Sequence, residues 1–492
     1  MTESTGSLYD LPNELAIETI RHLGTIRSFE PQSTAFRDKK EERARQSENH
    51  IRQVALHSLC LTSHHMRKIA TPVLYASFLS SATLHGYRPL ELFHRTVTSS
   101  TQMIGLKIHV SEYLQYVENR LSDYLGNNLY DDTNTSGASH MVARYFYLLA
   151  DIVKRAPNIR HLSVTSLEAS ELSFWKHILP KTAPVSTKVA GHGFPLLRNL
   201  CCQIHADSTS LEPSDNTFLR ICSAMSSVPS LVDFRASGCE NNSPSLPLFD
   251  SFKNLQRLVV TECTLDLDEV NRLLFACEDL QHITCEWAFL NSTTEQLSYL
   301  HPGLLKHAKT LQSLILDLRN ITFWPSDYTV PAPLGSLRHF TKLTSLAICE
   351  ATLCNYDPLS TALVYNGDPG LDEIHNIANL LPENLISLTL HLMTAARWVR
   401  HTPDATFALC QLAEDKRAGL IKVEEFTIKS AFELSAPRLM KGFQEAGVRF
   451  SIVQETHLDI PDIIWVCNST LGDSDVGIPT SSSISVASLN CQ

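Results

Sequence analysis

Histidine and cysteine are the residue types in this 492-residue chain that could do the most varied chemistry, because they serve as bases, nucleophiles and metal ligands. The sequence holds 21 histidines and 13 cysteines, yet it contains no His-Glu-x-x-His, Cys-x-x-Cys or Gly-x-Ser-x-Gly motif and no phosphate-binding loop. Gly191-His192-Gly193 is followed by Phe194-Pro195-Leu196, which breaks the dinucleotide-binding pattern. We therefore predict no catalytic residue, no metal site and no cofactor.

The placement of these residues indicates structural roles instead. His64 and His65 are neighbours and would point in different directions from a helix, so we expect surface residues rather than a ligand pair. The cysteine count is odd, and several cysteines fall on or just after apolar positions of a repeating pattern. These are Cys202, Cys263, Cys277 and Cys285. We predict reduced core thiols rather than a disulfide framework.

The charge and hydropathy of the chain argue against two classes of partner. Lys and Arg number 41 against 52 Asp and Glu, a net charge of -11, and no basic cluster indicates a nucleic-acid surface. No apolar run approaches the roughly 18 residues that a membrane span needs. The first seven residues have neither the basic nor the apolar region of a signal peptide. We therefore expect a cytoplasmic and/or nuclear protein that binds neither nucleic acid nor membrane.

The elements that would position any binding residue repeat along the chain. A pattern of the form apolar-x-x-apolar-x-apolar returns at irregular spacing, which is typical of a solenoid of short parallel strands. Its central residues are Leu106, Leu162, Leu200, Phe234, Leu258, Ile283, Leu314, Leu346, Leu388 and Phe426. The intervening sequence turns helical, most clearly over 266–277. We predict an α/β fold, an irregular solenoid (horseshoe) that resembles the leucine-rich-repeat proteins.

A doubly wound α/β enzyme would also alternate strands with helices. Its strands would be continuous apolar runs that end in a Gly-rich or catalytic loop, and none of the predicted strands is followed by one. An enzyme with a cryptic site is the remaining catalytic alternative.

The first 80 residues have a different pattern. Pro12 stands where a first helical turn tolerates a missing N–H, and apolar residues with helical spacing follow up to Leu23. A second apolar series from Leu56 to Leu74 predicts two further short helices with a break at Pro72. Three helices of this size bury little core by themselves, so we expect a partner.

Two stretches of this unit resemble the F-box proteins, especially those of fungi: Leu11-Pro12-x-Glu14-Leu15 with Ile20-x-x-Leu23, and Leu59-x-Leu61-Thr62-Ser63 with Pro72-x-Leu74-Tyr75. The resemblance implies a small three-helix F-box that docks on the Skp adaptor of an SCF-type ubiquitin ligase and, through it, meets cullin and RING subunits. The residues that it implies as adaptor contacts, or as the packing that presents them, are Leu11, Pro12, Leu15, Ile20, Leu23, Leu59, Val73, Leu74 and Tyr75.

One segment departs from the F-box pattern, the insert between Gly24 and His50. It carries a run of mixed charges at 37–45, which predicts a solvated helical arm or a disordered loop without a role of its own. The expected organisation is an F-box over 8–80 with this insert at about 24–50, a leucine-rich-repeat-like solenoid over 81–466, and a disordered Ser-rich tail over 467–492.

The resemblance implies a substrate-recognition subunit that is not itself an enzyme and that directs ubiquitin-dependent degradation of an unknown protein substrate. Our candidate substrate contacts on the concave strand face are Arg235, Arg257, His282, Glu286, Asp317 and His391. The alternative is a leucine-rich-repeat scaffold for protein–protein interaction whose N-terminal helices only cap the solenoid. Exposure of Leu11, Pro12 and Leu74 would favour the adaptor, and their packing on the first repeat would favour the cap.

Overall fold

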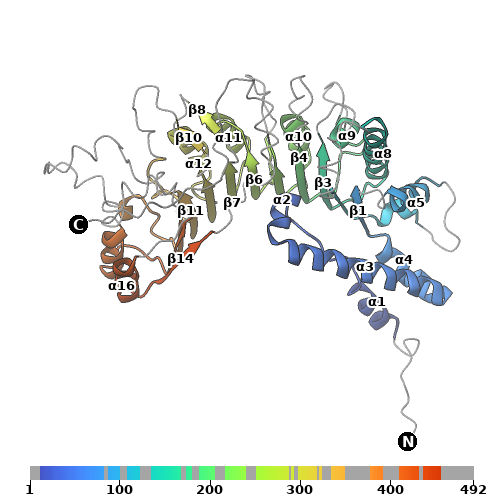
Figure 1. Ribbon diagram of the computed structural model, residues 1–492, viewed down its shortest axis with the longest axis horizontal. Helices are drawn as coiled ribbons and strands as arrows, with labels where there is room; N and C mark the ends of the chain where they lie inside the picture. The colour runs from blue at the N-terminus through green and yellow to red at the C-terminus, as the bar shows by residue number, and fades with distance from the viewer. Residues whose placement is uncertain are drawn as a thin grey trace, which may run out of the picture.

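The computed structural model describes residues 12–82, 87–99, 108–121, 135–167, 173–179, 188–205, 217–239, 251–287, 290–292, 297–318, 321–323, 334–349, 377–391, 409–430 and 436–455. Within these ranges twelve strands form one parallel sheet in the order β1-β2-β3-β4-β5-β6-β7-β9-β11-β12-β13-β14. The sheet is curved, with helices along its outer side and the N-terminal helices on its inner side (Figure 1). The predicted α/β class is confirmed, and the relation to leucine-rich repeats stays a prediction.

Each strand is short and pairs in parallel with its neighbours. The strands of the large sheet are β1 (Ser77–Ala82), β2 (Tyr116–Leu121), β3 (His161–Leu167), β4 (Asn199–His205), β5 (Asp233–Ser237), β6 (Arg257–Cys263), β7 (His282–Trp287), β9 (Ser313–Asp317), β11 (Ser345–Cys349), β12 (Ser387–His391), β13 (Glu425–Ser430) and β14 (Arg449–Gln454). A separate two-stranded parallel sheet consists of β8 (Leu290–Ser292) and β10 (Ile321–Phe323).

The pairing keeps the apolar residues of successive strands in register. Leu258 pairs with Ile283 and Ile283 with Leu314, and all three are buried. Because side chains alternate along a strand, the residues immediately before and after each of these buried positions face the inner side of the sheet. One hydrophobic core extends along the sheet from Phe78 to Val448.

The predicted repeat units from Leu162 to Phe426 are all strands of this sheet. The unit at Leu106 lies outside the described residues. The strand that precedes β3 in the sheet is β2, which the apolar pattern missed because a core position of β2 holds Asn119. The Asn119 side chain donates to the Thr165 carbonyl of β3 at 2.9 Å and accepts from the Thr165 N–H at 3.0 Å. These bonds satisfy a polar group that burial would otherwise penalise.

The helices that follow β1 are short, apart from one of 20 residues. They are α5 (Tyr87–Thr98), α6 (Val110–Tyr113), α8 (Thr135–Lys154), α9 (Phe174–Ile178), α10 (Thr217–Ser226), α11 (Leu267–Phe275), η3 (Leu297–Leu300), α12 (His301–Lys306), η6 (Ile377–Asn379) and α16 (Pro437–Glu445). The helix expected over 266–277 is α11, which begins with a capping box between Asp266 and Glu269. Of the helices in the described ranges, none is long and apolar enough to cross a membrane.

The cysteines singled out from the sequence lie in this core. Cys202, Cys263, Cys277 and Cys285 are buried, and every cysteine that the structure describes is a free thiol. Burial raises the pKa of Cys277 and Cys285 to about 12, so both stay protonated at neutral pH. The predicted role as reduced core thiols is confirmed.

Five elements precede β1. They are α1 (Asn13–Arg21), α2 (Gln32–Ala35), the 3-10 turn η2 (Phe36–Asp38), α3 (Lys39–Thr62) and α4 (His64–Leu74). The break between the last two helices falls at Ser63, whose hydroxyl accepts from the Met66 N–H at 3.1 Å. The predicted break at Pro72 was wrong, because this serine cap starts α4 earlier and Pro72 lies inside the helix.

Three of these helices, α1, α4 and the second half of α3, share a small core of their own. Its buried residues are Ile20, Leu56, Cys60, Met66 and Ala70. We call these three helices the helical unit. The first half of α3 lies instead on the inner side of the large sheet (Figure 1), so one continuous helix belongs to both parts of the molecule.

Candidate functional site

The insert after α1 crosses the inner face of the sheet. We call its residues 25–38 the strap. The Ser28 N–H donates to the Tyr116 hydroxyl of β2 at 3.0 Å, and the Arg37 guanidinium pairs with Glu286 of β7 at 2.7 Å. The strap thus extends from β2 to β7, and α3 returns toward β2 (Figure 1). The predicted helical arm is confirmed for the part of the insert that begins α3, but neither a fully solvated arm nor a disordered loop is present within the described residues 24–50, because polar partners on the sheet fix this segment.

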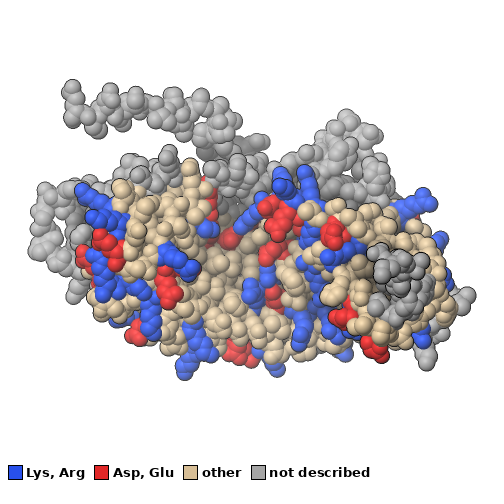
Figure 2. All heavy atoms as spheres, turned by 90° about the horizontal axis from the view of Figure 1, so that it is seen from below, with Lys and Arg blue, Asp and Glu red and all other residues tan. Residues whose placement is uncertain are grey.

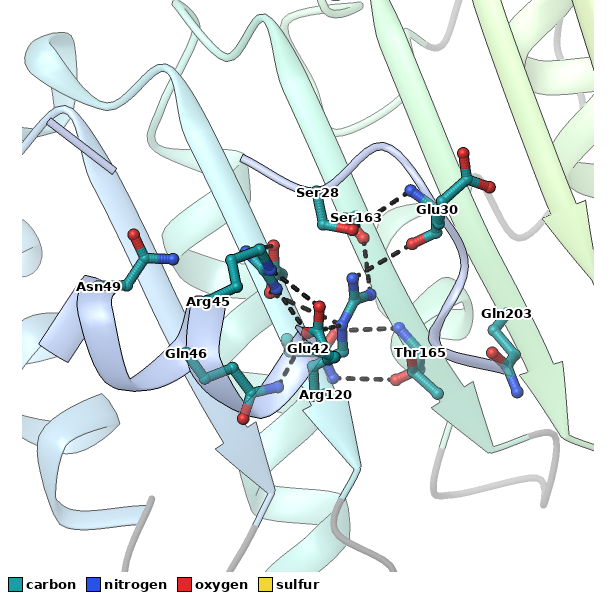
Figure 3. A network of polar contacts seen from close by, with 12 residues as sticks. Ser28, Glu30, Glu42, Arg45, Gln46, Asn49, Arg120, Ser163, Thr165 and Gln203 are labelled. Atoms are coloured by element: carbon teal, nitrogen blue, oxygen red, sulfur yellow. Dashed lines mark hydrogen bonds and ion pairs between the residues drawn. The ribbon is translucent and has the colours of Figure 1, made fainter. Parts of the chain in front are cut away.

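A buried cluster of four charged side chains joins α3 to β2 (Figure 3). The Arg45 guanidinium donates to the two carboxylate oxygens of Glu42 at 2.6 and 2.8 Å, and to Glu118 of β2 at 2.6 Å. Arg120 of β2 lies 3.7 Å from Glu42 and 3.6 Å from Glu118. These side chains are only 3–11% exposed, so each charge depends on the others for compensation.

The electrostatics of the cluster favour its charged form. Burial alone would raise the pKa of Glu42, but hydrogen bonds from Arg45 and Gln46 lower it below its ordinary value. Burial alone would likewise lower the pKa of Arg45, and the bonds to Glu42 and the charge of Glu118 raise it instead. Glu42 and Arg45 are therefore both charged at neutral pH.

The same elements hold the first residues of the strap. Arg45 donates to the Ile26 carbonyl at 2.9 Å. The Asn49 side chain accepts from the Ile26 N–H at 2.7 Å and donates to the Ile26 carbonyl at 3.0 Å. Arg120 donates to the Glu30 carbonyl at 3.1 Å (Figure 3). The beginning of the strap is thus fixed from both α3 and β2.

His161 of β3 lies under the strap. Its ring meets Phe29 edge-on, with 5.0 Å between ring centroids, and lies 4.7 Å from the Tyr116 ring. Burial lowers the pKa of His161, and the positive charges of Arg27 and Arg120 lower it further, to about 3. The imidazole is therefore neutral in the folded protein at every pH near neutrality.

Acid is expected to destabilise the protein through His161. Below about pH 6.5 the unfolded chain binds a proton at this residue, while the folded chain binds it only near pH 3. Stability is therefore complete above about pH 6.5 and falls by about 1.4 kcal/mol per pH unit as the pH drops toward 3. The His161→Phe variant keeps a ring between Phe29 and Tyr116 and removes the titration.

Urea unfolding at about pH 6.5 and about pH 5 tests this expectation. Between these values the wild type should lose about 2 kcal/mol more than His161→Phe. Equal pH dependence of the two proteins would contradict a depressed pKa at His161.

Two of the predicted substrate contacts are already engaged by the strap. Arg235 of β5 pairs with Glu30 of the strap and, at 3.0 Å, with Asp233. Glu286 pairs with Arg37. The expectation that these side chains face a partner directly was wrong for this conformation, because the insert occupies that part of the inner face.

The other predicted substrate contacts lie on both sides of the point where the strap ends. Arg257 of β6 is 3.8 Å from Asp233. His282 is partly exposed, and burial and the charge of Arg257 lower its pKa. His391 of β12 reaches across β11 to within 3.9 Å of Asp317 of β9 and is buried by this arrangement, although we expected it to face a partner.

Three strands beyond the strap carry rows of uncharged residues on the inner face. On β9, β11 and β12 these partly exposed residues are Ser313, Ile315, Ser345, Ala347, Ser387 and Thr389, aligned in two rows by the strand register. Figure 2 looks onto this side of the molecule and shows a mostly uncharged area between two groups of charged residues. These rows differ from the charged face under the strap, while Asp317 on β9 and Glu425 and Lys429 on β13 place charged side chains around them.

The predicted adaptor contacts fall into two groups. Pro12 and Leu15 on α1 are exposed, Leu15 at 54%. The contacts that pack in or against the small core are Ile20, Leu23, Leu59, Val73 and Leu74. The Tyr75 ring lies 6.0 Å from that of Phe93 on α5, which ties it to the first helix after β1. Leu11 lies outside the described residues.

Helix α3 presents exposed apolar residues that the sequence reasoning did not name as contacts, although Leu61 belongs to the F-box-like motif. Ile51, Val54 and Leu61 are 59%, 52% and 66% exposed. At 100° per residue they lie on the face of α3 opposite Leu56 and Cys60, which are buried. The sequence signal for this exposed face was that the apolar residues of α3 spread around more of the helix than a single buried stripe would occupy. The helical unit therefore exposes apolar side chains on two elements.

No family model, curated protein or solved structure matches this chain. In the described ranges, no group of three or more His, Cys, Asp or Glu side chains could hold a metal ion. The features on which a function can be argued are thus the exposed apolar residues of the helical unit and the inner face of the sheet.

Proposed function

We propose that this protein is the substrate-recognition subunit of an SCF-type ubiquitin ligase. In this proposal the helical unit is an F-box that binds the Skp adaptor, and the curved sheet binds a protein substrate. The adaptor supplies the link to cullin and RING subunits, where ubiquitin is transferred. This chain contributes by holding the substrate near the activated ubiquitin, which raises its effective concentration.

The observation that carries the proposal is the exposure of apolar side chains on a unit with a very small core. Leu15 and Leu61, which belong to the motifs that resemble an F-box, are more than half exposed. Apolar residues on a small helical unit are costly to leave in water, and a partner that covers them would stabilise the unit. The adaptor is the partner that the sequence resemblance implies.

One observation favours the alternative, a scaffold whose N-terminal helices cap the solenoid. Helix α3 is continuous from the sheet into the helical unit. Leu74 packs against the unit's own core rather than that of the sheet, so it favours neither function. A cap requires only this connection to the sheet, and it does not explain why Leu15 and Leu61 are exposed to solvent. Adaptor binding is the property that separates the two functions.

The test is co-purification of the chain with the Skp adaptor. The Leu61→Asp variant should weaken binding about tenfold to a hundredfold, since one leucine buried at an interface contributes about 1.5–3 kcal/mol. Leu420→Asp is the matched control, because Leu420 is 63% exposed and lies far from the helical unit. It should bind like the wild type.

Two outcomes would contradict the proposal. If the wild type does not bind the adaptor, the scaffold function stands. If Leu61→Asp and Leu420→Asp both bind like the wild type, the exposed face of α3 is not the docking surface.

A further inference from the structure

The strap is held by two sets of contacts of unequal strength. Its first residues are anchored by Asn49 and Arg45, which are themselves part of a buried network. From Phe29 to Asp38 the strap also bonds to buried side chains, through the Glu30 carbonyl to Arg120 and the Ser33 N–H to Gln203, but its ion pairs lie closer to solvent. The Glu30 carboxylate that pairs with Arg235 is 42% exposed, and the Arg37 guanidinium that pairs with Glu286 is 53% exposed. Ion pairs at such positions contribute little to stability, so the strap's hold on Arg235 and Glu286 is the part of its contacts that a competitor displaces most readily.

The surface under the strap has the properties of a peptide-binding face. Its polar side chains bind the main chain of the strap as well as its side chains. The Ser33 N–H donates to the Gln203 side chain of β4 at 2.7 Å, and the Ser33 hydroxyl lies 2.9 Å from that of Ser237 on β5. Bonds to main-chain N–H groups do not depend on the sequence of the strap, so another polypeptide could make them.

The charged side chains of this face determine the direction in which a bound polypeptide runs across it. Arg235 on β5 binds an acidic residue of the strap, and Glu286 on β7 binds a basic residue seven positions later. Glu262, on β6 between them, adds to the negative potential that acts on Arg37. A ligand must therefore present its acidic residue toward β5 and its basic residue toward β7.

We propose that the inner face of β3–β7 is a docking surface for a partner polypeptide that carries an acidic side chain followed about seven residues later by a basic one. The strap occupies this surface in the free protein and competes with the partner. The proposal deepens the proposed function, since it assigns a surface and a ligand chemistry to substrate capture. It does not involve the helical unit.

The probe for this surface is a fluorescein-labelled peptide of residues 25–38, whose binding is measured by fluorescence anisotropy. In Glu30→Ala/Arg37→Ala the strap loses both ion pairs while the sheet is unchanged. The peptide should bind this variant about twofold to thirtyfold more tightly than the wild type, because the competing strap loses two exposed ion pairs worth about 0.2–1 kcal/mol each. Arg43→Ala, on the exposed side of α3, should bind the peptide like the wild type.

A charge exchange tests the predicted direction. Adding Glu286→Arg to the double variant should abolish binding of the native peptide, and a peptide with Arg37→Glu should restore it. Circular dichroism establishes that each variant is folded, and the single Arg37→Ala variant replaces the double one if that fails to fold. No binding to the loosened variants, or equal binding to them and the wild type, would overturn the proposal. Adaptor binding is measured separately, so its loss would not be confused with this result.

Discussion

Replacing Arg45 by Met is expected to lower the free energy of unfolding by about 3–5 kcal/mol. The substitution leaves the carboxylates of Glu42 and Glu118 buried without the guanidinium that binds both of them. It also removes the hydrogen bond to the Ile26 carbonyl, so the base of the strap should loosen. Urea unfolding at neutral pH measures the effect.

Two comparisons isolate the buried charges as the cause. Arg43→Met lies two residues earlier on the exposed side of α3 and should change stability by no more than about 0.5 kcal/mol. Adding Glu118→Gln to Arg45→Met should recover part of the loss, because one uncompensated carboxylate is removed. A loss below about 1 kcal/mol for Arg45→Met would mean that water compensates the carboxylates.

Gly238→Ala is expected to lower the free energy of unfolding by more than about 3 kcal/mol. Gly238 follows β5 with a φ of +68°, a conformation that costs an L-residue about 1–2 kcal/mol. A Cβ at this position would also lie well inside the contact distance of the Ile204 carbonyl oxygen on β4. Since that atom belongs to the backbone of a neighbouring strand, relief requires the sheet itself to shift.

Gly419→Ala provides the matched control for this substitution. Gly419 has a φ of +75°, and no atom would lie within 4 Å of an added Cβ. Gly419→Ala should lower the free energy of unfolding only by the cost of a positive φ in an L-residue, about 1–2 kcal/mol. Equal losses at the two positions, measured by thermal unfolding, would show that the Ile204 contact does not matter.

The sheet could be predicted from the sequence because its signal is local and repeated. Each strand places apolar residues at alternate positions, as in Leu314 and Leu316 of β9, and both are buried. Two strands of the large sheet were missed, β1, which the prediction left largely within the F-box region, and β2. In β2 a core position holds Asn119, whose bonds to Thr165 depend on the neighbouring strand. A single sequence contains no local sign of that pairing.

The strap could not be predicted because its stabilising residues are polar. Glu42, Arg45 and Asn49 recur with helical spacing, a pattern equally typical of a solvated helix face. The sheet partners of Glu42 and Arg45, which are Glu118 and Arg120, lie more than 70 residues away. The resemblance implied its nine residues as adaptor contacts or as the packing that presents them; Pro12 and Leu15 are exposed, Leu74 packs against the small core, and adaptor contact stays a prediction.

The continuity of α3 has a geometric consequence for the ligase that we propose. The helix has 24 residues and is therefore about 36 Å long. One end is fixed to β2 through Arg45, and the other carries Leu61 at the exposed face of the helical unit. A substrate on the sheet and an adaptor at Leu61 would be held apart by a rigid rod rather than a tether. Only those substrate lysines that lie within one range of distances from the segment bound on the sheet would reach the ubiquitin.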